Sequence, residues 1–206
     1  MKIVLIRHGD AEGAHGHAIG QTDLPLSLRG REDIAALAEH WPGPPPDAVW
    51  SSDLIRAVDS ARLWCKRVGG PTPHIDPRLR ELSLGDIEGL RWEDPRVSDD
   101  PQVRAWLDDW VHLAPPGGET LTALEARLQA FRATLPTAGT VVVFSHATPI
   151  RLWLGGVLGW PRTRLFELEL PTASASALHR HSSGFEVSFA GQREPDFRAF
   201  LTDTSE

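Results

Sequence analysis

The chain has 206 residues, of which 41% are hydrophobic and 24% are charged. These are globular values, and they exclude an intrinsically disordered chain and a collagen-like repeat. The 28 acidic residues outnumber the 21 basic ones, and the net charge of −7 argues against nucleic acid or an anionic membrane as the main partner. We therefore expect a single globular domain over residues 1–206.

Short apolar runs rich in β-branched residues alternate with helix-like segments along the first part of the chain. Residues 3–6 and 47–50 are typical of buried strands. A helix is expected over residues 29–40, and a second one carries Leu54, Val58, Ala61 and Cys65 at helical spacing. We expect Trp50, at the end of the second strand, to lie in the core.

The middle and the end of the chain differ from this pattern. Residues 71–90 are irregular, and residues 100–114 predict a Trp-rich amphipathic helix. The remaining expected elements are a helix over 120–135, a strand over 140–144, a mostly buried helix over 150–158, and antiparallel strands over 174–180 and 184–190 joined at Ser182-Ser183. In the polar stretch after Gly191, Phe197, Phe200 and Leu201 are candidates for anchoring the tail to the rest of the protein. Strands that alternate with helices indicate an α/β fold with a mainly parallel sheet.

Three of the expected strands end in side chains that suit an anion. Arg7-His8 follows the first strand, Ser51-Ser52 follows the second with Arg56 just inside the next helix, and Ser145-His146 follows the third. Ligands bind outside the carboxyl ends of parallel strands, so neighbouring strands would bring two arginines and two histidines together. Each of these residues alone is more typical of a surface or capping side chain. The four together favour a phosphate site.

The residue types then suggest the chemistry. A neutral imidazole can attack phosphorus and form a phosphohistidine, while arginines neutralise the phosphoryl oxygens without a metal. An alkoxide leaving group also needs a proton donor. Residues 80–89 supply carboxylates at Glu81, Asp86 and Glu88. A solvated loop acid is the ordinary interpretation of Glu81, and the pattern alone does not overturn it.

Six motifs in order over residues 2–155 carry a family resemblance. They are Leu5-Ile6-Arg7-His8-Gly9, Gly20-Gln21-Thr22-Asp23-Leu24-Pro25-Leu26-Ser27, Ser51-Ser52-Asp53-Leu54-Ile55-Arg56-Ala57, Leu79-Arg80-Glu81-Leu82 with Glu88-Gly89, Pro116-Gly117-Gly118-Glu119-Thr120 and Phe144-Ser145-His146-Ala147. With them the chain resembles the histidine phosphatase superfamily, the phosphoglycerate mutase-like enzymes. The resemblance implies a three-layer α/β/α sandwich with a mainly parallel central sheet, in which residues 88–117 form a helical cap-like insertion.

The resemblance also implies roles for individual residues. His8 matches the nucleophile, and Glu81 matches the acid that protonates the leaving group and then activates water. Arg7, Arg56 and His146 match residues that bind the phosphoryl group, and Gly20 and Gln21 are further candidates for substrate binding. The chain departs from the family pattern where Asp10-Ala11 follows the glycine and where an expected asparagine is absent near Ala14 and His15. No cofactor and no metal are expected, and a homodimer is compatible with the family.

Four functions fit this resemblance. The first is a phosphomonoesterase acting on a small metabolite, closest to the α-ribazole phosphatase and broad-specificity phosphatase branch, with α-ribazole 5'-phosphate as a candidate substrate. A cofactor-dependent phosphoglycerate mutase is the second, although residues 88–115 offer few of the extra basic residues that mutases use. An inactive anion-binding module would be expected to have lost His8 or Glu81. A protein phosphohistidine phosphatase resembles a shorter chain without the Glu81 region.

The remaining sequence features favour ordinary structural roles. Cys65 is the only cysteine, so no internal disulfide forms, and its helical context suggests a small core residue. The pairs His15/His17 and His179/His181 lack the neighbouring ligands of a metal site. The apolar run at residues 3–6 is too short for a signal peptide, and no stretch approaches a membrane span. We expect a soluble cytoplasmic enzyme whose partner is a small phosphomonoester.

Overall fold

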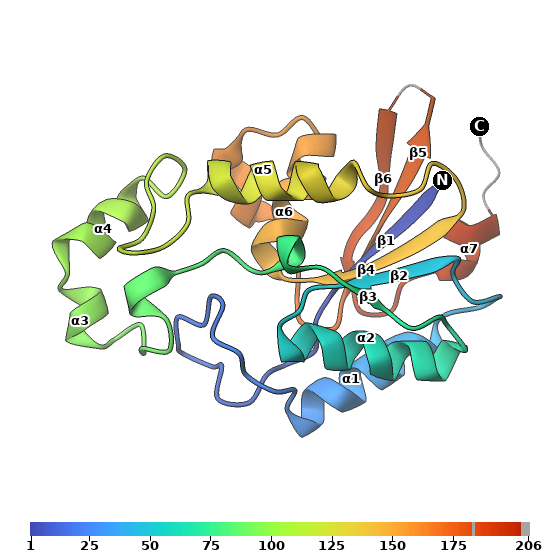
Figure 1. Ribbon diagram of the computed structural model, residues 1–206, viewed down its shortest axis with the longest axis horizontal. Coiled ribbons are helices and arrows are strands. Elements are labelled where there is room, and N and C mark those ends of the chain that lie inside the picture. The colour runs from blue at the N-terminus through green and yellow to red at the C-terminus, as the bar shows by residue number, and fades with distance from the viewer. Residues whose placement is uncertain (183, 203–206) are drawn as a thin grey trace.

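The computed structural model describes residues 1–182 and 184–202, and its centre is one six-stranded sheet (Figure 1). The strands lie in the order β3-β2-β4-β1-β5-β6. Their bounds are Lys2–Arg7 for β1, Ala48–Ser51 for β2, His74–Ile75 for β3, Thr140–Ser145 for β4, Ala175–His181 for β5 and Gly184–Gln192 for β6. The expected strands are confirmed, and β3 is an additional short edge strand within the segment expected to be irregular.

The sheet is parallel on one side and antiparallel on the other. β1 runs parallel to β4, which runs parallel to β2, and β2 runs parallel to β3. β5 pairs antiparallel with β1 and with β6, as the alternation of the two segments predicted. The predicted junction at Ser183 lies outside the described residues. Four neighbouring parallel strands therefore end on the same edge of the sheet.

Helices cover both faces of this sheet and complete three layers (Figure 1). One face packs against α1 (Leu28–Glu39), α2 (Ile55–Val68) and the C-terminal α7 (Phe197–Thr202), and the other against α5 (Leu121–Arg132) and α6 (Ala147–Val157). Successive side chains of β1 point to opposite faces of the sheet. Ile3 and Leu5 belong to the core cluster on one face, and Val4 and Ile6 belong to the cluster on the other. The expected α/β sandwich is confirmed.

Glycines set the distance between α1 and the end of β1. A Cβ atom on Gly30 would lie 2.1 Å from the Asp10 carbonyl oxygen, and one on Gly9 would lie 2.4 Å from the Gly30 carbonyl oxygen. Real Cβ atoms do not approach backbone that closely. The glycine after His8 is therefore required by the packing of the helix against the strand end.

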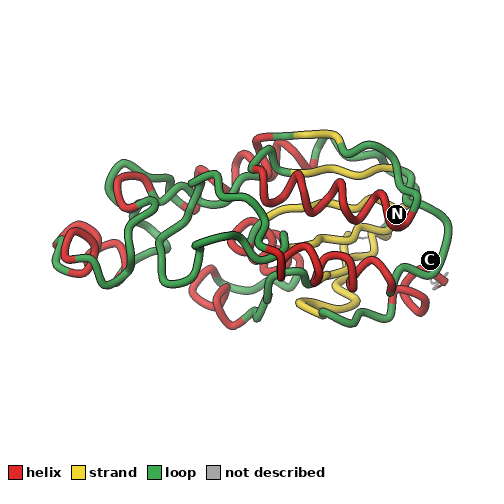
Figure 2. Tube along the Cα trace, turned by 90° about the horizontal axis from the view of Figure 1, so that it is seen from below, coloured by secondary structure: helices red, strands yellow, loops and turns green. Residues whose placement is uncertain are grey.

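The Trp-rich helix of the middle segment is shorter than predicted. Two separate helices, α3 (Pro95–Ser98) and α4 (Pro101–Asp108), lie at the end of the molecule away from the N-terminus (Figures 1 and 2). The chain turns after Asp108, so Trp110 leaves the helix and packs edge-on against Phe166 at 4.7 Å. The predicted helix over residues 100–114 is wrong at its C-terminal end because this tertiary contact replaces its last turn.

Other packing predictions have mixed outcomes. Phe197 and Phe200 are buried and anchor the tail. Cys65 is buried as expected, and burial raises the pKa of its thiol to about 11. Trp50 is only half-buried, because its neighbour β3 is two residues long and leaves part of the sheet face open.

Among the described residues, no helix is long and apolar enough to cross a bilayer.

Candidate active site

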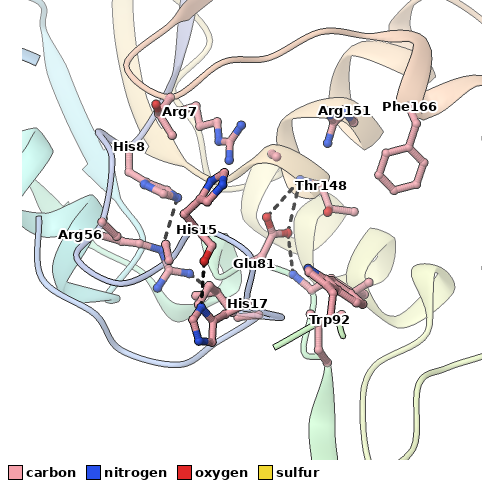
Figure 3. A pocket seen from close by; sticks show the side chains of 18 of the residues that line it. Arg7, His8, His15, His17, Arg56, Glu81, Trp92, Thr148, Arg151 and Phe166 are labelled. Carbon is pink, nitrogen blue, oxygen red and sulfur yellow. Dashed lines mark hydrogen bonds between the residues drawn. The ribbon is translucent and has the colours of Figure 1, made fainter. Parts of the chain in front are cut away.

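The carboxyl ends of β2, β4 and β1 meet at one edge of the sheet. β4 pairs with both of the other strands, with Ser145 opposite Arg7 and Phe144 opposite Ser51. The three predicted strand ends are therefore neighbours, and the structure brings Arg7, His8, Arg56 and His146 together. Of these, Arg7, His8 and Arg56 line a cavity of about 690 Å³ (Figure 3), whereas His146 is not among the lining residues.

His8 lines this cavity with one protonated and one unprotonated ring nitrogen. Its side chain is buried, and Nδ1 lies 2.6 Å from the Gly9 carbonyl oxygen. A carbonyl only accepts, so Nδ1 carries the proton and Nε2 holds a lone pair. Arg56 Nε donates to that lone pair over 3.3 Å. Burial, followed by the charges of Arg56 and Arg7, holds the pKa of His8 well below its usual range, so the ring stays neutral.

Arg56 is held rigidly in the floor of the cavity. It is 2% exposed and lies in the first turn of α2, where its Nη1 donates to the Thr22 carbonyl over 2.7 Å and its Nη2 to the Gly20 carbonyl over 2.7 Å. Gly20 itself lines the cavity with a φ of +48°. A side chain there would meet Glu88 Oε1 at 2.5 Å, so the loop that grips Arg56 requires glycine.

Arg7 is the second guanidinium of the cavity. Its Nη1 donates to the Leu170 carbonyl, and within the described part of the chain its buried Nε has no hydrogen-bond partner. Burial is the main cause that lowers the pKa of Arg7, and the charge of Glu81 opposes this effect. A buried, incompletely bonded guanidinium beside a second arginine is an arrangement that an anion would stabilise.

His146 is completely buried next to His8. The ring centroids lie 4.9 Å apart, and Nε2 of His146 lies 2.9 Å from the Ser52 hydroxyl. Burial, with the neighbouring His8 and arginines, holds the pKa of His146 well below its usual range. Its Nδ1 has no hydrogen-bond partner among the residues that the structure describes. His146 therefore lies next to His8 without lining the cavity itself.

Glu81 lies on the opposite wall, at the N-terminus of α6. Its carboxylate accepts a hydrogen bond from the Leu82 N–H over 2.8 Å, and the Thr148 N–H lies 3.3 Å from both of its oxygens (Figure 3). Glu81 lines the cavity, whereas Asp86 and Glu88 do not. The structure thus distinguishes Glu81 from the two other carboxylates that the sequence offered.

Glu88 and Gln21 have supporting positions. Glu88 Oε1 accepts from the backbone N–H groups of Gln21 and Leu84 at 3.0 and 2.8 Å. The Gln21 side chain donates from Nε2 to the Glu81 carbonyl over 3.0 Å, and Gln21 is not among the residues that line the cavity. The structure therefore places Gln21 behind Glu81, where it fixes the backbone of the carboxylate's segment.

The outer part of the cavity is aromatic and apolar, and it also contains one cation. Sequence reasoning missed most of this wall, which includes Leu84, Trp92, Trp106, Leu107, Trp110, Thr148, Arg151 and Phe166. Leu107 is half exposed because it faces this space rather than the core. A signal for Arg151 was present in the sequence, since it is the one charged residue in a helix expected to be mostly buried.

Of the two histidine pairs that the sequence offered, His15 and His17 line the cavity, whereas His179 and His181 do not (Figure 3). His17 Nδ1 donates to the His15 carbonyl over 2.9 Å, and the rings of His179 and His181 lie 5.7 Å apart. Over residues 1–182 and 184–202, no three His, Cys, Asp or Glu side chains form a group that could hold a metal ion.

Comparison with known proteins gives consistent relatives. The chain is 30% identical over 182 residues to an adenosylcobalamin/α-ribazole phosphatase of Escherichia coli (strain K12), covering 86% of this chain and 89% of the relative. It is 34% identical to a glucosyl-3-phosphoglycerate phosphatase of Mycolicibacterium vanbaalenii, over 78% and 75% of the two chains. A probable phosphoglycerate mutase of an Enterobacter species is 27% identical over 93% of both chains.

Solved structures agree with these relatives. A putative α-ribazole-5'-P phosphatase from Escherichia coli superposes with a TM-score of 0.85 at 28% identity, covering 94% of this chain and 97% of the other. A mycobacterial glucosyl-3-phosphoglycerate phosphatase in complex with VO3 gives 0.78 at 31% identity, covering 92% and 98%. The family model described as "Histidine phosphatase superfamily (branch 1)" matches residues 3–192. The chain therefore belongs to the histidine phosphatase superfamily.

Proposed function

We propose that this protein is a phosphomonoesterase that hydrolyses a small phosphorylated metabolite through a phosphohistidine formed on His8. The observation that carries the proposal is the state of His8, whose unprotonated Nε2 accepts a 3.3 Å hydrogen bond from Arg56 in a cavity that Arg7 and Arg56 also line. A neutral imidazole in this position is a nucleophile for phosphorus. Phosphatases among the relatives support the same reaction class.

In the first step, the phosphoryl group replaces the Arg56 hydrogen bond at His8. Nε2 attacks phosphorus while the bond from phosphorus to the ester oxygen breaks, and Arg7 and Arg56 neutralise the phosphoryl oxygens. The protonated Glu81 carboxyl group gives its proton to the leaving oxygen, which departs as an alcohol. The positive charge on the phosphorylated ring is stabilised because Nδ1–H donates to the Gly9 carbonyl oxygen.

The second step regenerates the enzyme. The Glu81 carboxylate takes a proton from a water molecule, whose oxygen attacks phosphorus as the bond from phosphorus to Nε2 breaks. Inorganic phosphate leaves, Nε2 regains its lone pair, and Glu81 is again protonated. One carboxylate thus serves as acid and then as base, and its position on the wall opposite His8 suits both roles (Figure 3).

Residues 88–117 supply the proposed cap over this centre. Trp92, Trp106, Leu107 and Trp110 from this segment line the outer cavity. They would exclude water from the leaving group and choose among alcohols. The names of the relatives give α-ribazole 5'-phosphate and glucosyl-3-phosphoglycerate as two candidate substrates, and both are small phosphomonoesters.

Phosphate release from a panel of alkyl and aryl phosphomonoesters, measured with excess chelator, tests the proposal. We expect hydrolysis of several members, no loss on chelation because the arginines neutralise the phosphoryl charge, and competitive inhibition by vanadate. His8→Asn should abolish phosphate release, whereas the matched control His40→Asn, at the exposed C-cap position that follows α1, should retain it. Release that survives His8→Asn, or no release from any ester, would contradict the proposal.

A further inference from the structure

We propose that Glu88 is a positioning residue for the reaction, because its carboxylate ties the loop that grips Arg56 to the segment that carries Glu81. The inference rests on the proposed phosphatase function and adds a residue to it. Arg56 and Glu81 line different walls of the cavity (Figure 3), whereas Glu88 does not line it. Glu88 would therefore act through the two residues and keep the phosphoryl-binding group and the proton donor at a fixed separation.

One oxygen of Glu88 contacts two segments that are far apart in the sequence. Oε1 accepts from the Gln21 N–H over 3.0 Å, from the Leu84 N–H over 2.8 Å and from the Ser83 hydroxyl over 3.2 Å. The first donor lies in the loop between β1 and α1, and the other two follow Glu81 closely in the chain. Hydrogen bonds to an ionised acceptor are roughly twice as strong as neutral ones, so this oxygen is a strong junction.

On the loop side, the junction lies next to the carbonyls that hold Arg56. Gly20 and Thr22 supply these carbonyls, and each accepts from a terminal nitrogen of Arg56 over 2.7 Å. Gln21, between them in the chain, is the residue whose N–H donates to Glu88. Oε1 of Glu88 lies so close to the loop that a Cβ atom on Gly20 would be only 2.5 Å from it. Loss of this contact would release both grips on the guanidinium.

On the other side, the junction supports the proton donor by two routes. The Gln21 side chain donates from Nε2 to the Glu81 carbonyl over 3.0 Å, so the residue that Glu88 holds also holds the backbone of Glu81. The second route is the turn at residues 83–84, which directly follows Leu82. The Leu82 N–H donates to the Glu81 carboxylate over 2.8 Å. The orientation of that carboxylate therefore depends on Glu88.

The backbone of Glu88 is fixed independently of its side chain. Its N–H donates to the Gly85 carbonyl over 3.1 Å, and the N–H of the next residue, Gly89, donates to the Ala18 carbonyl over 2.8 Å. These contacts use backbone atoms alone, so they persist when the side chain at residue 88 is changed. A substitution there consequently tests the carboxylate rather than the course of the chain.

Two variants at residue 88 test the link. Glu88→Ala removes the acceptor, whereas Glu88→Gln keeps an amide oxygen at the place of Oε1. In Glu88→Ala, we expect the single-turnover phosphorylation rate with an alkyl phosphate to fall about 10²-fold, the cost of misplacing a reacting group by about 1 Å. The fall with a nitrophenyl phosphate should be smaller, because its weakly basic leaving group has less need of a proton. The inhibition constant of vanadate should rise about 10-fold, because Arg56 is loosened as well.

Three further variants complete the experiment. Glu88→Gln should retain most of the wild-type values, and Asp86→Ala, which removes an exposed carboxylate of the same segment, should retain all of them. Gln21→Ala removes the bond to the Glu81 carbonyl but keeps the backbone N–H that Glu88 accepts. We expect Gln21→Ala to show the leaving-group effect without the vanadate effect, and it provides the test if Glu88→Ala does not fold.

Loss of folded protein gives a different result, because it lowers all rates by one factor and leaves inhibition constants unchanged. If Glu88→Ala behaves in that way, Glu88 contributes only to stability and the inference is wrong. A Glu88→Ala protein equal to the wild type, or a Glu88→Gln protein as impaired as Glu88→Ala, would also contradict it.

Two measurements keep this test independent of catalysis. Inorganic phosphate is titrated into His8→Ala and into His8→Ala/Glu88→Ala, and hydrogen exchange of the Leu82 amide is followed in both proteins. We expect the double variant to bind phosphate about 10-fold more weakly and to exchange the Leu82 amide faster. If the wild-type protein hydrolyses no ester but both differences are present, the proposed function is wrong and the link stands. If esters are hydrolysed and neither difference is present, the link is wrong and the function stands.

Discussion

At the scale of single residues, the chemistry of the active site depends on which ring nitrogen of His8 carries the proton. His8 has its proton on Nδ1 because its partner there is the Gly9 carbonyl, which leaves Nε2 unprotonated. Arg56 Nε donates to that nitrogen at 3.3 Å, a contact that the phosphoryl group can replace. One backbone carbonyl thus fixes the tautomer of His8, and burial together with the charges of Arg56 and Arg7 keeps the ring unprotonated by lowering its pKa.

Glu81→Gln tests the proton donor. An alkyl phosphate leaves as a strongly basic alkoxide, so loss of the acid should slow its phosphorylation step about 10²–10⁴-fold. A nitrophenyl phosphate leaves as a weakly basic phenolate and should lose much less. Single-turnover rates on both substrates provide the measurement, because steady-state rates can report hydrolysis of the phosphohistidine instead. Equal losses for the two leaving groups would show that Glu81 is not the acid.

The residues that follow strands were predictable, and those on the cavity wall were not. Arg7, His8, Arg56 and His146 could be placed together because carboxyl ends of parallel strands share one edge. Arg151 reaches the cavity from the second turn of α6, and Phe166 comes from a separate helical turn over Arg162–Glu167. Their meeting depends on how distant segments pack, which no local pattern encodes.

At the scale of elements, α5 holds the irregular segment that carries Glu81. Arg127 on α5 donates from Nη1 to the carbonyls of Arg78 and Arg80, both over 2.7 Å, and from Nη2 to that of Glu81 over 2.9 Å. Glu119 accepts from Nε and from Nη2 of the same guanidinium, each over 2.8 Å. This clamp gives a loop carboxylate a fixed position and explains why Glu119 follows the two glycines before α5.

Arg127→Met should therefore affect stability and activity together. Breaking a mostly buried ion pair leaves Glu119 without its partner, and we expect the free energy of unfolding to fall by about 3–5 kcal/mol. Urea unfolding measures this change, and Arg162→Met is the matched control, because its pair with Glu125 on α5 is more exposed and should cost about 1 kcal/mol or less. Equal destabilisation by both variants would contradict the clamp.

Element prediction failed where tertiary contacts override periodicity. The spacing of Val103, Trp106, Leu107 and Trp110 indicates one helical face, and Val103 and Trp106 are buried as that face requires. The helix nevertheless ends at Asp108, and Trp110 instead packs on Phe166. Regular elements in contact with the sheet followed their patterns because the sheet fixes which face is buried.

At the scale of the whole molecule, two buried neutral histidines connect folding to pH. Burial is the main cause that holds the pKa values of His8 and His146 well below that of an unfolded histidine, about 6.5, and the nearby charges of Arg56 and Arg7 act in the same direction. Below that pH the unfolded chain binds protons that the folded protein does not. The free energy of unfolding is therefore greatest above about pH 6.5 and falls as the pH is lowered.

Urea unfolding between pH 7 and pH 5 checks this linkage. Each histidine should contribute a slope of up to about 1.4 kcal/mol per pH unit in that range. The double variant His8→Asn/His146→Asn should show a shallower dependence than the wild-type protein, and His40→Asn, at an exposed site, should show the same dependence. A double variant with an unchanged slope would assign the pH dependence to other groups.

The most direct measurement for the central claim is identification of the phosphorylated residue. The protein is mixed with a radiolabelled phosphomonoester, quenched in alkali within a single turnover, digested and mapped. We predict a label that is stable to alkali, labile to acid, located on His8 and absent from His8→Asn. Label on His146 or Ser52, or turnover without any trapped label and with inversion at phosphorus, would contradict the account.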